Sequence, residues 1–360
     1  MLTSPRRAGF HWLAESIWEQ GWNVIFMTTG ISHLSRLKRH KGRLEMLKAA
    51  PLNQVVWHKQ HLASFTWYTP WHPVKFQSHV LNTLTEPFFQ QYSKFPLYEM
   101  ETYFKQADLV IFESTSGLML FDRVQKLNPN ARLVYRVSDD LRVINAHPCL
   151  LSIEQRIAPQ FDLISLPSKH LRQIFPPMDS VVVHPQGIKP QLFDQPSRNP
   201  YAADGRINAV SVGTMLLDQE FFMYASHAFP QINFHIIGGM EPFLEASNVT
   251  FYGEMSFGET IPYLQWADLG LAIYRTNPNA AAYLSQSSNK MIQYTYCQLP
   301  IVAPYFVCED RPHAFAYYPD RPETIFQAIQ EALKYDRTLI WIKDIPSWSH
   351  LGASISGVMT

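Results

Sequence analysis

The chain has 360 residues, of which 46% are hydrophobic, and its 30 basic side chains are balanced by 30 acidic ones. This length fits two α/β domains of ordinary size, each with enough apolar residues for a core. A formal net charge of zero lacks the electrostatic footprint of a nucleic-acid-binding protein.

The cysteines are few, scattered and odd in number: Cys149, Cys297 and Cys308. They form neither a disulfide framework nor a zinc-site spacing, and they favour a reducing cytoplasm. No apolar run reaches 18 residues and no signal-peptide core is visible. The sequence therefore predicts no transmembrane helix, while attachment to a membrane surface stays open.

The first half of the chain alternates short apolar runs with amphipathic stretches, which is typical of a parallel sheet with crossover helices. The pattern predicts helices at Trp12–Gln20 and Gly117–Leu127. Strands are predicted at 23–27, 54–57, 109–113, 131–136, 163–166 and 180–184. A domain of this type should open with a strand, yet the sequence starts in a loop, Thr3–Gly9. We therefore expect either an apolar strand encoded upstream or a first sheet that lacks one strand.

A Pro/Asn/Asp-rich stretch, Lys189–Arg206, is predicted to link the two domains. A second α/β series follows it, with helices predicted at Phe221–Ala228 and Met291–Tyr296. Its predicted strands are 209–212, 233–237, 249–252, 269–273 and 301–303. The chain thus reads as two doubly wound units.

An acidic pair, Asp139-Asp140, follows the predicted strand that ends at Arg136. Ligands of open α/β sheets bind at the carboxyl ends of strands, so one of these carboxylates is a candidate general base on a hydroxyl. The alternative is that Asp139 or Asp140 caps the following helix.

Three capping-type residues, Ser287, Ser288 and Asn289, precede Lys290 at a predicted helix start. Backbone N–H groups at a helix N-terminus bind anions, and a lysine in the first turn adds a full positive charge. This strand–loop–helix unit suits a nucleotide diphosphate. An ordinary N-cap with a solvated lysine is the alternative.

Two glycine-containing turns, 213–215 and 238–240, also follow predicted strands. They permit close approach of a ligand, but equally serve as tight turns, and neither matches a dinucleotide fingerprint. Glu254 follows another strand and is a candidate for bridging ribose hydroxyls; a solvated loop glutamate is the alternative.

A basic run lies in the first domain, near tryptophans and prolines at Trp67–Pro73. Basic residues beside exposed aromatic residues suit an anionic membrane or a lipid diphosphate, although such a run is more often a solvated face. The basic residues that we assign to acceptor or membrane binding are Arg6, Arg7, Arg36, Lys38 and Arg39.

Long collinear blocks resemble the bacterial glucuronosyltransferases of xanthan biosynthesis, the GumK-like GT-B family. The blocks are VIFES (110–114), NPNARLVYRVSDDL (128–141), VGTMLLDQEFF (212–222), AFPQINFHIIG (228–238), YGEM (252–255) and SSNKMIQY (287–294). The resemblance runs nearly from end to end. It implies two Rossmann-like domains facing a cleft, with UDP held by the second. Asp140 stands where the relative has glycine, Asn289 replaces a methionine, and the family's first strand has no counterpart.

The resemblance also implies the activity: inverting, metal-independent transfer of glucuronate from UDP-glucuronate to a polyprenyl-diphosphate-linked oligosaccharide of an exopolysaccharide, without cofactor. The reaction would take place at the cytoplasmic face of the inner membrane. Asp139 matches the family's base, and the nucleotide-sugar contacts fall on Met215, Glu254, Met255, Tyr274, Lys290 and Gln293. By the same resemblance we expect an acceptor domain at 1–188, a donor domain at 189–336, and a segment at 337–360 that crosses back.

From the residues themselves, Lys290 and the amides around Ser287 and Ser288 would stabilise the leaving UDP, since no DxD motif is present. A glucuronate donor also needs a cation for its carboxylate: Lys290, Arg275 or Arg6/Arg7. Two alternatives remain, a GT-B transferase for another UDP-sugar and a non-catalytic sugar-nucleotide-binding protein.

Overall fold

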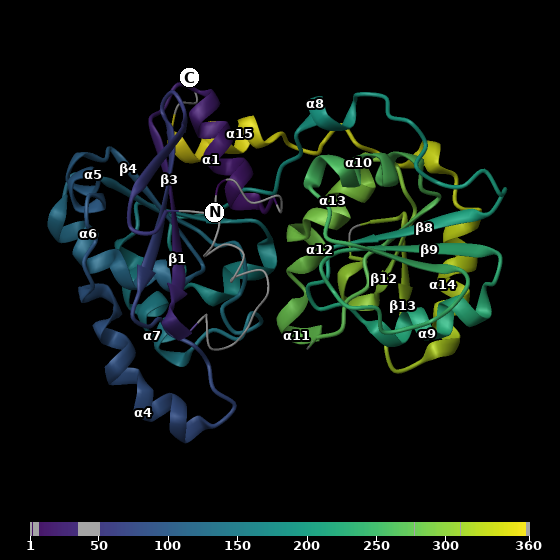
Figure 1. Cartoon of the computed structure of the whole chain (residues 1–360), viewed down its shortest axis with the longest axis horizontal. Helices are drawn as coiled ribbons and strands as arrows, with labels where there is room; N and C mark the ends of the chain where they lie inside the picture. The colour runs from purple at the N-terminus through teal and green to yellow at the C-terminus, as the bar shows by residue number, and fades with distance from the viewer. Residues whose placement is uncertain (1, 3–6, 35–50, 277, 310, 358–360) are drawn as a thin grey trace. The chain divides into compact units, whose positions relative to one another are not determined.

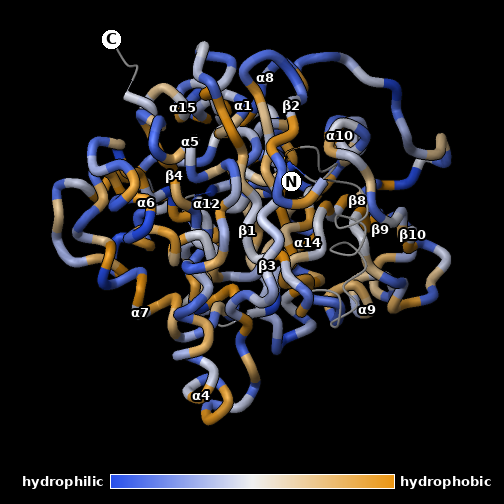
Figure 2. Tube along the Cα trace, turned by 60° about the vertical axis from the view of Figure 1, so that its left-hand side comes forward, coloured by the Kyte–Doolittle hydropathy of each residue, from blue (hydrophilic) through white to orange (hydrophobic). Residues whose placement is uncertain are grey.

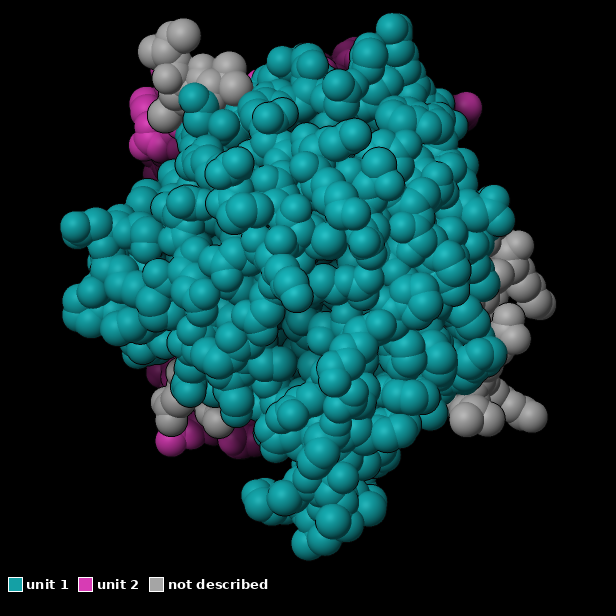
Figure 3. Space-filling model, turned by 90° about the vertical axis from the view of Figure 1, so that its left-hand side faces the viewer, with its two compact units in different colours: residues 1–4, 10–184, 351–360 teal, residues 5–9, 185–350 magenta. Residues whose placement is uncertain are grey.

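The computed structural model describes residues 2, 7–34, 51–276, 278–309 and 311–357, which form two compact units (Figures 1 and 3). Of the described residues, the first unit holds residue 2, residues 10–184 and the chain from residue 351 on; the second holds residues 7–9 and 185–350. Each unit is an α/β structure whose strands are mainly parallel. The functional domain limits given above stay a prediction.

The first unit contains two separate sheets. One has the strand order β1-β3-β2 and the other the order β4-β5-β6-β7, and every pairing is parallel except that of β2 with β3. The strands are β1 Val24–Ser32, β2 Val55–Lys59, β3 Leu62–Thr69, β4 Leu109–Glu113, β5 Arg132–Arg136, β6 Leu163–Leu166 and β7 Val181–Val183. The α-helices are α1 Gly9–Glu19, α4 His79–Phe89, α5 Met100–Gln106, α6 Phe121–Leu127, α7 Pro148–Ile157 and, from the chain end, α15 Trp348–Ser356.

Helix α15 joins the first unit through its last two turns. A Cβ added to Gly352 would lie 2.4 Å from Ser16 Oγ in α1. The two helices therefore pack too closely at this point for a side chain at position 352. Arg132, at the start of β5, donates from Nη1 to the carbonyl oxygen of Ile355 at 2.9 Å. The chain end is therefore part of the fold of the first unit.

The second unit is a single six-stranded parallel sheet of order β10-β9-β8-β11-β12-β13. Its strands are β8 Ile207–Val212, β9 Ile232–Ile237, β10 Val249–Gly253, β11 Leu269–Leu271, β12 Ile301–Pro304 and β13 Ala314–Tyr317. Its α-helices are α8 Pro190–Phe193, α9 Gln219–Ala228, α10 Phe257–Trp266, α11 Pro278–Ala281, α12 Leu284–Ser287, α13 Asn289–Tyr296 and α14 Pro322–Lys334. Fully buried aromatic rings from α9, β9 and β13 fill one side of the core, where burial of each large apolar side chain is worth about 1.5–3 kcal/mol.

Most predicted strands are confirmed to within a few residues; the predicted helix 12–20 overlaps α1 except for its last residue, and the predicted helices 221–228 and 291–296 fall within α9 and α13. The predicted helix Gly117–Leu127 is divided into a 3-10 helix, Ser116–Leu120, and α6. The strand β3 was not predicted, although Ala63, Phe65 and Trp67 alternate with Ser64 and Thr66 along it.

The aromatic cluster at Trp67–Pro73 is not the exposed surface that we expected. Trp67 lies in β3, is fully buried, and donates from its indole Nε1 to the carbonyl oxygen of Pro96 at 2.8 Å. Trp71 is half-buried and stacks on Phe88 with ring centroids 4.1 Å apart. The prediction was wrong because an aromatic run looks the same in sequence whether it lines a core or a surface.

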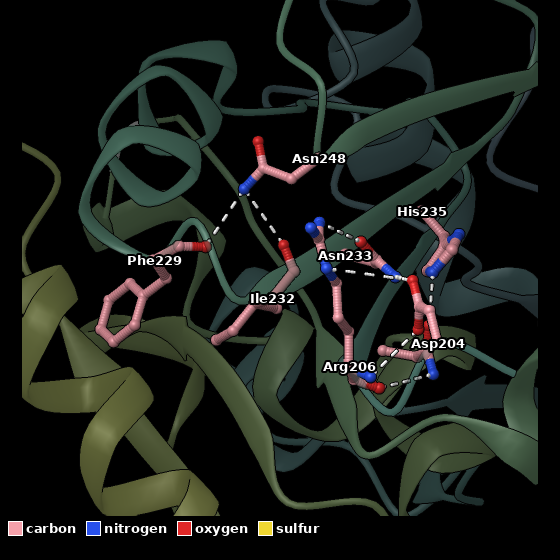
Figure 4. Close-up of polar contacts among 8 residues, drawn as sticks. Asp204, Arg206, Phe229, Ile232, Asn233, His235 and Asn248 are labelled. Carbon is pink, nitrogen blue, oxygen red and sulfur yellow. Dashed lines mark hydrogen bonds and ion pairs between the residues drawn. The ribbon is translucent and has the colours of Figure 1, made fainter. Parts of the chain in front are cut away.

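A network of hydrogen bonds connects the segments at the amino end of the second sheet (Figure 4). Asn248 precedes β10 and is buried, and its side-chain Nδ2 lies 3.0 to 3.1 Å from the carbonyl oxygens of Ser226, Phe229 and Ile232. Nearby, Asn233 makes a more exposed contact, from Nδ2 to Asp204 Oδ2 at 3.1 Å. The two asparagines therefore differ in burial and in the number of groups that they satisfy.

We expect Asn248→Ala to destabilise the second unit by about 1–3 kcal/mol, because buried carbonyl groups would lose their donor. Asn233→Ala is the matched control and should change stability by about 0.5 kcal/mol or less, as exposed substitutions do. Hydrogen exchange at the amides of β9, followed by mass spectrometry, measures both. Equal losses of stability in the two variants would show that the buried hydrogen bonds of Asn248 do not stabilise this end of the sheet.

Candidate functional site

The carboxyl edge of the second sheet contains a topological switch point. The chain leaves β8 towards β9 and β10 on one side, and β11 continues to β12 and β13 on the other. Ligands of open α/β sheets bind at such points. The segments that follow β8 and β11 contact each other there: Leu217 forms an isolated bridge with Tyr274, and the Arg275 N–H donates to Leu216 O at 2.8 Å.

The loop after β8 requires an unusual backbone. Gly213 has φ +85°, a conformation that favours glycine. At the end of β9, Gly238 leaves no room for a side chain, since an added Cβ would lie 2.4 Å from Thr214 Cγ2. These two glycines therefore allow the turns after β8 and β9 to pack closely.

Ser288 is the N-cap of α13, as the sequence predicted. Its Oγ accepts a hydrogen bond from Met291 N at 3.3 Å and lies 2.5 Å from the hydroxyl oxygen of Tyr274. Ser287 instead ends the preceding short helix, α12. The Tyr274–Ser288 contact joins the end of β11 to the start of α13.

The amides of Ser287 and Ser288 are not the anion-binding groups that we expected. They already donate to the carbonyl oxygens of Tyr283 and Leu284, at 3.0 and 3.1 Å. The correction has a structural cause, because α12 runs directly into the cap of α13. The first two amides of α13, those of Asn289 and Lys290, have no carbonyl partner within a helix and remain to meet an anion.

Lys290 extends back over the switch point. Its Nζ lies 3.4 Å from Gly213 O and 4.9 Å from the centroid of the Tyr274 ring. The side chain is half-buried, and burial lowers the pKa of Lys290 to about 8. An ammonium held over an aromatic ring beside a helix N-terminus differs from the solvated lysine of the alternative interpretation, and it suits a diphosphate.

The other predicted donor residues lie in α13 or follow strands of the same sheet. Gln293 is half-buried in α13, one turn after Lys290, and Met215, after β8, is 51% exposed. Glu254 is exposed after β10, while Met255 is half-buried and lines a hollow of about 660 Å³ with Tyr263. Their roles as nucleotide-sugar contacts stay a prediction.

Arg275 is surrounded by carboxylates. Its guanidinium lies 2.5 Å from Glu220, 3.4 Å from Asp218 and 3.8 Å from Asp320. The hydrogen bond with Glu220 is the main cause that raises the pKa of Arg275. Because these acids compensate its charge, Arg275 is a poor candidate for binding a donor carboxylate. The sequence did not show this compensation, since Asp320 lies far along the chain.

The candidate base lies in the first unit, after β5. Asp139 is half-buried, and the backbone N–H groups of Ser138 and Asp139 point to Ser114 Oγ at 3.2 and 3.5 Å. Asp140 is buried and binds the side chain of Arg142 at 2.5 Å. The helix-cap alternative is wrong for both aspartates, because α7 begins at Pro148 and is capped by His147.

A second carboxylate, which sequence reasoning missed, lies beside this loop. Glu113 ends β4, and its Oε1 accepts a hydrogen bond from Ser138 Oγ at 2.7 Å. Burial raises the pKa of Glu113 to about 7; the bond from Ser138 opposes this shift, and the charge of Asp139 adds to it. The only signal in the sequence was an acidic residue at the end of an apolar strand next to that of the candidate base.

A buried chain of hydroxyl groups fixes Ser114. The Tyr135 hydroxyl oxygen lies 2.5 Å from Glu154 Oε1 and 3.2 Å from Ser114 Oγ. Burial raises the pKa of Glu154 to about 7 and that of Tyr135 well above its usual value. Ser114 is thereby held in place to support the loop that carries Asp139.

Of the basic residues assigned to acceptor or membrane binding, only Arg7 is described, and it is half-buried. Arg6, Arg36, Lys38 and Arg39 lie outside the described residues. Within the described ranges, no group of three or more His, Cys, Asp or Glu side chains is placed to hold a metal ion.

The sequence matches the family described as "Glucuronosyltransferase GumK, N-terminal domain" over residues 1–167. It is also 33% identical over 337 residues to a UDP-glucuronate:glycolipid 2-beta-glucuronosyltransferase of Xanthomonas campestris pv. campestris. That alignment covers 93% of this chain and 82% of the relative.

Solved structures show the fold. The UDP-forming trehalose-phosphate synthase of Burkholderia xenovorans, solved with glucose-6-phosphate, has a TM-score of 0.59 at 9% identity, over 98% of this chain and 96% of its own. AviGT4, a glycosyltransferase of avilamycin A biosynthesis, has a TM-score of 0.51 at 13% identity, over 97% of this chain and 87% of its own. The chain has the GT-B fold of these glycosyltransferases, which confirms the expected fold class.

The raised pKa of Glu113 has a consequence for stability. Between pH 4.5, the ordinary pKa of the carboxyl group, and pH 7 the folded protein holds a proton that the unfolded chain has released. Stability should therefore fall as the pH rises through this window. Glu113→Gln is neutral throughout, so its melting temperature relative to that of the wild type should rise from pH 4 to pH 8.

Glu259→Gln is the control for this measurement. Glu259 is exposed and its bonds to Ser256 lower its pKa, so between pH 5 and 8 it is ionised in both states. Thermal unfolding of the three proteins across pH 4–8 gives the comparison. A constant difference between Glu113→Gln and the wild type would contradict the raised pKa.

Proposed function

The chain belongs to the glucuronosyltransferase GumK family, and we propose that it transfers glucuronate from UDP-glucuronate to a polyprenyl-diphosphate-linked oligosaccharide in exopolysaccharide biosynthesis. It is a glycosyltransferase with the GT-B fold. The structural observation that carries the donor assignment is the position of Lys290 over Tyr274 at the N-terminus of α13. The substrates named for the Xanthomonas relative support the choice of sugar and of a lipid-linked acceptor.

The second unit binds the diphosphate of the donor in this proposal. The ammonium of Lys290 and the first amides of α13 meet its negative charge, and the charge grows as UDP leaves. Because burial lowers the pKa of Lys290 to about 8, a bound anion also favours the protonated form. We propose that these groups stabilise the leaving UDP without a metal ion.

The first unit supplies the base. Asp139 takes the proton of the acceptor hydroxyl as its oxygen forms a bond to the anomeric carbon, and the bond from that carbon to the diphosphate oxygen breaks. Direct displacement of this kind inverts the anomeric configuration. Ser114 and Glu113 act through the loop: they bind Ser138 and the backbone of Asp139 and so position the carboxylate.

Attachment to the cytoplasmic face of the inner membrane is the location that we propose. Helix α4 projects from the first unit, and Figure 2 shows apolar segments along it. Its exposed apolar residues, at spacings of three and four, share one side: Val80, Leu81, Leu84 and Phe88. A helix with such a face can lie in the membrane interface. In the described part of the chain, no helix is long and apolar enough to cross a bilayer.

Substitutions of Asp139 and Lys290 should have different effects on turnover and on UDP binding. Asp139→Asn keeps the shape but loses the proton acceptor, so turnover should fall by roughly 10²–10⁴ while UDP affinity is nearly unchanged. Lys290→Ala should weaken UDP binding and also slow transfer, because the cation acts on the bound diphosphate and on the leaving group. UDP release, with lipid-linked acceptor present, and calorimetric titration with UDP measure the two effects.

The same assay tests the donor and the class of protein. A panel of UDP-sugars should give turnover with UDP-glucuronate above the others; preference for UDP-glucose would move the assignment to another sugar. Binding of UDP without turnover of any donor would indicate a non-catalytic protein. An active Asp139→Asn enzyme would exclude Asp139 as the base, and suspicion would move to Asp140.

Leu84→Glu should weaken binding to anionic vesicles several-fold, since it places a charge on the apolar side of α4. Leu339→Glu, in the second unit, is the matched control, because the two leucines are 70% and 66% exposed. Co-sedimentation with anionic and neutral vesicles at low and high salt measures binding. The anionic component should weaken with salt, because charge attraction is screened within about 8 Å at physiological ionic strength. Binding equal to that of the wild type in Leu84→Glu would exclude α4.

A further inference from the structure

The pairing of β8 with β11 ends before the two strands do. Residues 207–276 are all described, and within them this pairing covers Ala209–Val210 and Leu269–Gly270. Beyond these residues, Val212 still pairs with β9 and Leu271 still pairs with β12. The ladder between β8 and β11 is therefore interrupted at the switch point of the sheet, where the candidate donor site lies.

The hydroxyl group of Tyr294, in α13, lies in this interruption. It accepts a hydrogen bond from Val212 N at 3.0 Å and donates to Leu271 O at 3.5 Å. In a continuous parallel ladder, backbone N–H and carbonyl groups of neighbouring strands bond to each other. Here a side-chain hydroxyl, which can donate and accept at once, is placed between them. Tyr294 therefore satisfies both strands while it holds their carboxyl ends apart.

The ring of Tyr294 has a fixed place on β11. The residue is fully buried, and a Cβ added to Gly270 would lie 2.6 to 3.1 Å from the Cδ2, Cγ and Cβ atoms of Tyr294. Any side chain at position 270 would therefore displace the ring, because a close-packed interior has no room for it. The glycine lets the ring lie directly against the backbone of β11, so that the hydroxyl reaches the strand ends.

Tyr294 also determines where Lys290 lies. The two residues are four apart on α13 and therefore share one side of the helix. Lys290 Nζ lies 3.4 Å from the carbonyl oxygen of Gly213, and the preceding residue, Val212, donates to Tyr294. The helix start is held separately by its cap, Ser288. The hydroxyl of Tyr294 and the cap thus fix α13 on the sheet at two points, with Lys290 between them.

We propose that Tyr294 is a positioning residue of the donor site. Its hydroxyl group holds β8 and β11 apart at the switch point and so places Lys290 and the turn at Gly213 for the diphosphate. Because Tyr294 is buried, it acts through these groups and not by contact with the donor. The inference rests on the proposed function, since it concerns the same donor site.

Tyr294→Phe removes the hydroxyl group and keeps the ring. The dissociation constant for UDP, measured by calorimetric titration, should rise about three- to tenfold, as the loss of one hydrogen bond predicts. The KM for the UDP-sugar should rise by a similar factor, while the KM for the lipid-linked acceptor stays unchanged. Hydrogen exchange at the Val212 amide should become faster, because its acceptor is lost in an otherwise folded protein.

Thr295→Val is the matched control. Thr295 is the next residue of α13 and is also buried, and its hydroxyl donates to Met291 O at 2.8 Å and lies 2.9 Å from His313 Nε2. The variant removes a buried hydroxyl group from the same helix, but one whose partners lie in α13 and just before β13. UDP affinity and exchange at the Val212 amide should therefore be those of the wild type.

A double-mutant cycle with Lys290→Ala separates positioning from a general structural role. If Tyr294 acts through Lys290, adding Tyr294→Phe to the Lys290→Ala protein should change the UDP dissociation constant by less than about twofold. A hydroxyl that only stabilises the fold would weaken UDP binding by the same factor in both backgrounds.

Three outcomes would overturn the inference alone: wild-type UDP affinity in Tyr294→Phe, equal weakening in Thr295→Val, or independent effects in the cycle. Each leaves the donor assignment in place as long as Lys290→Ala itself weakens UDP binding. Unchanged UDP binding in Lys290→Ala would instead refute the donor assignment, and the role of Tyr294 with it. The two failures are therefore distinguished by the single variant of Lys290.

Discussion

A short contact between two hydroxyl groups determines where the cation of the donor site lies. The hydroxyls of Tyr274 and Ser288 are 2.5 Å apart, and Ser288 also caps α13. One side chain thus fixes both the start of the helix and the tyrosine that follows β11. Lys290, two residues into the helix, then lies over the ring of that tyrosine. The contact therefore places the Tyr274 ring beside the N-terminus of α13, where the helix dipole favours an anion.

In the first unit, ionisable groups near the candidate base are buried. Arg136 is buried and donates from Nη1 to Ser165 Oγ and His184 O at 2.8 and 2.7 Å. Burial lowers the pKa of Arg136 to about 9, and Glu113, its partner across the β4–β5 register, partly opposes that shift. A buried cation is tolerated where neighbours satisfy its donors and a carboxylate is close. Glu113 therefore acts on two groups: its charge favours the protonated guanidinium of Arg136, and its Oε1 accepts a hydrogen bond from the Ser138 hydroxyl.

The sequence was sufficient to predict those features of the fold and the site that depend on one short segment. Apolar runs located most of the strands, and the carboxyl end of a strand located Asp139. It was insufficient where distant segments meet. The compensation of Arg275 depends on Asp218, Glu220 and Asp320, which come from two separate parts of the chain. The amides of Ser287 and Ser288 were misjudged because α12 is too short to leave a periodic signal. The burial of Trp67 depends on the partners of β3, and no local pattern contains them.

The strand β4 and the candidate base of the first unit are connected through Ser114. β4 ends at Glu113, and the next residue, Ser114, holds the backbone of Ser138 and Asp139. Among the described residues, β4 is paired with β5 alone, and its residues also line a cavity of about 970 Å³. Local opening is easiest where few contacts hold a segment, so motion of β4 would be transmitted to Ser114 and then to the carboxylate. Pairing on both edges of β4 would restrict this motion. Ser114 therefore links the end of β4 to the loop that carries the candidate base.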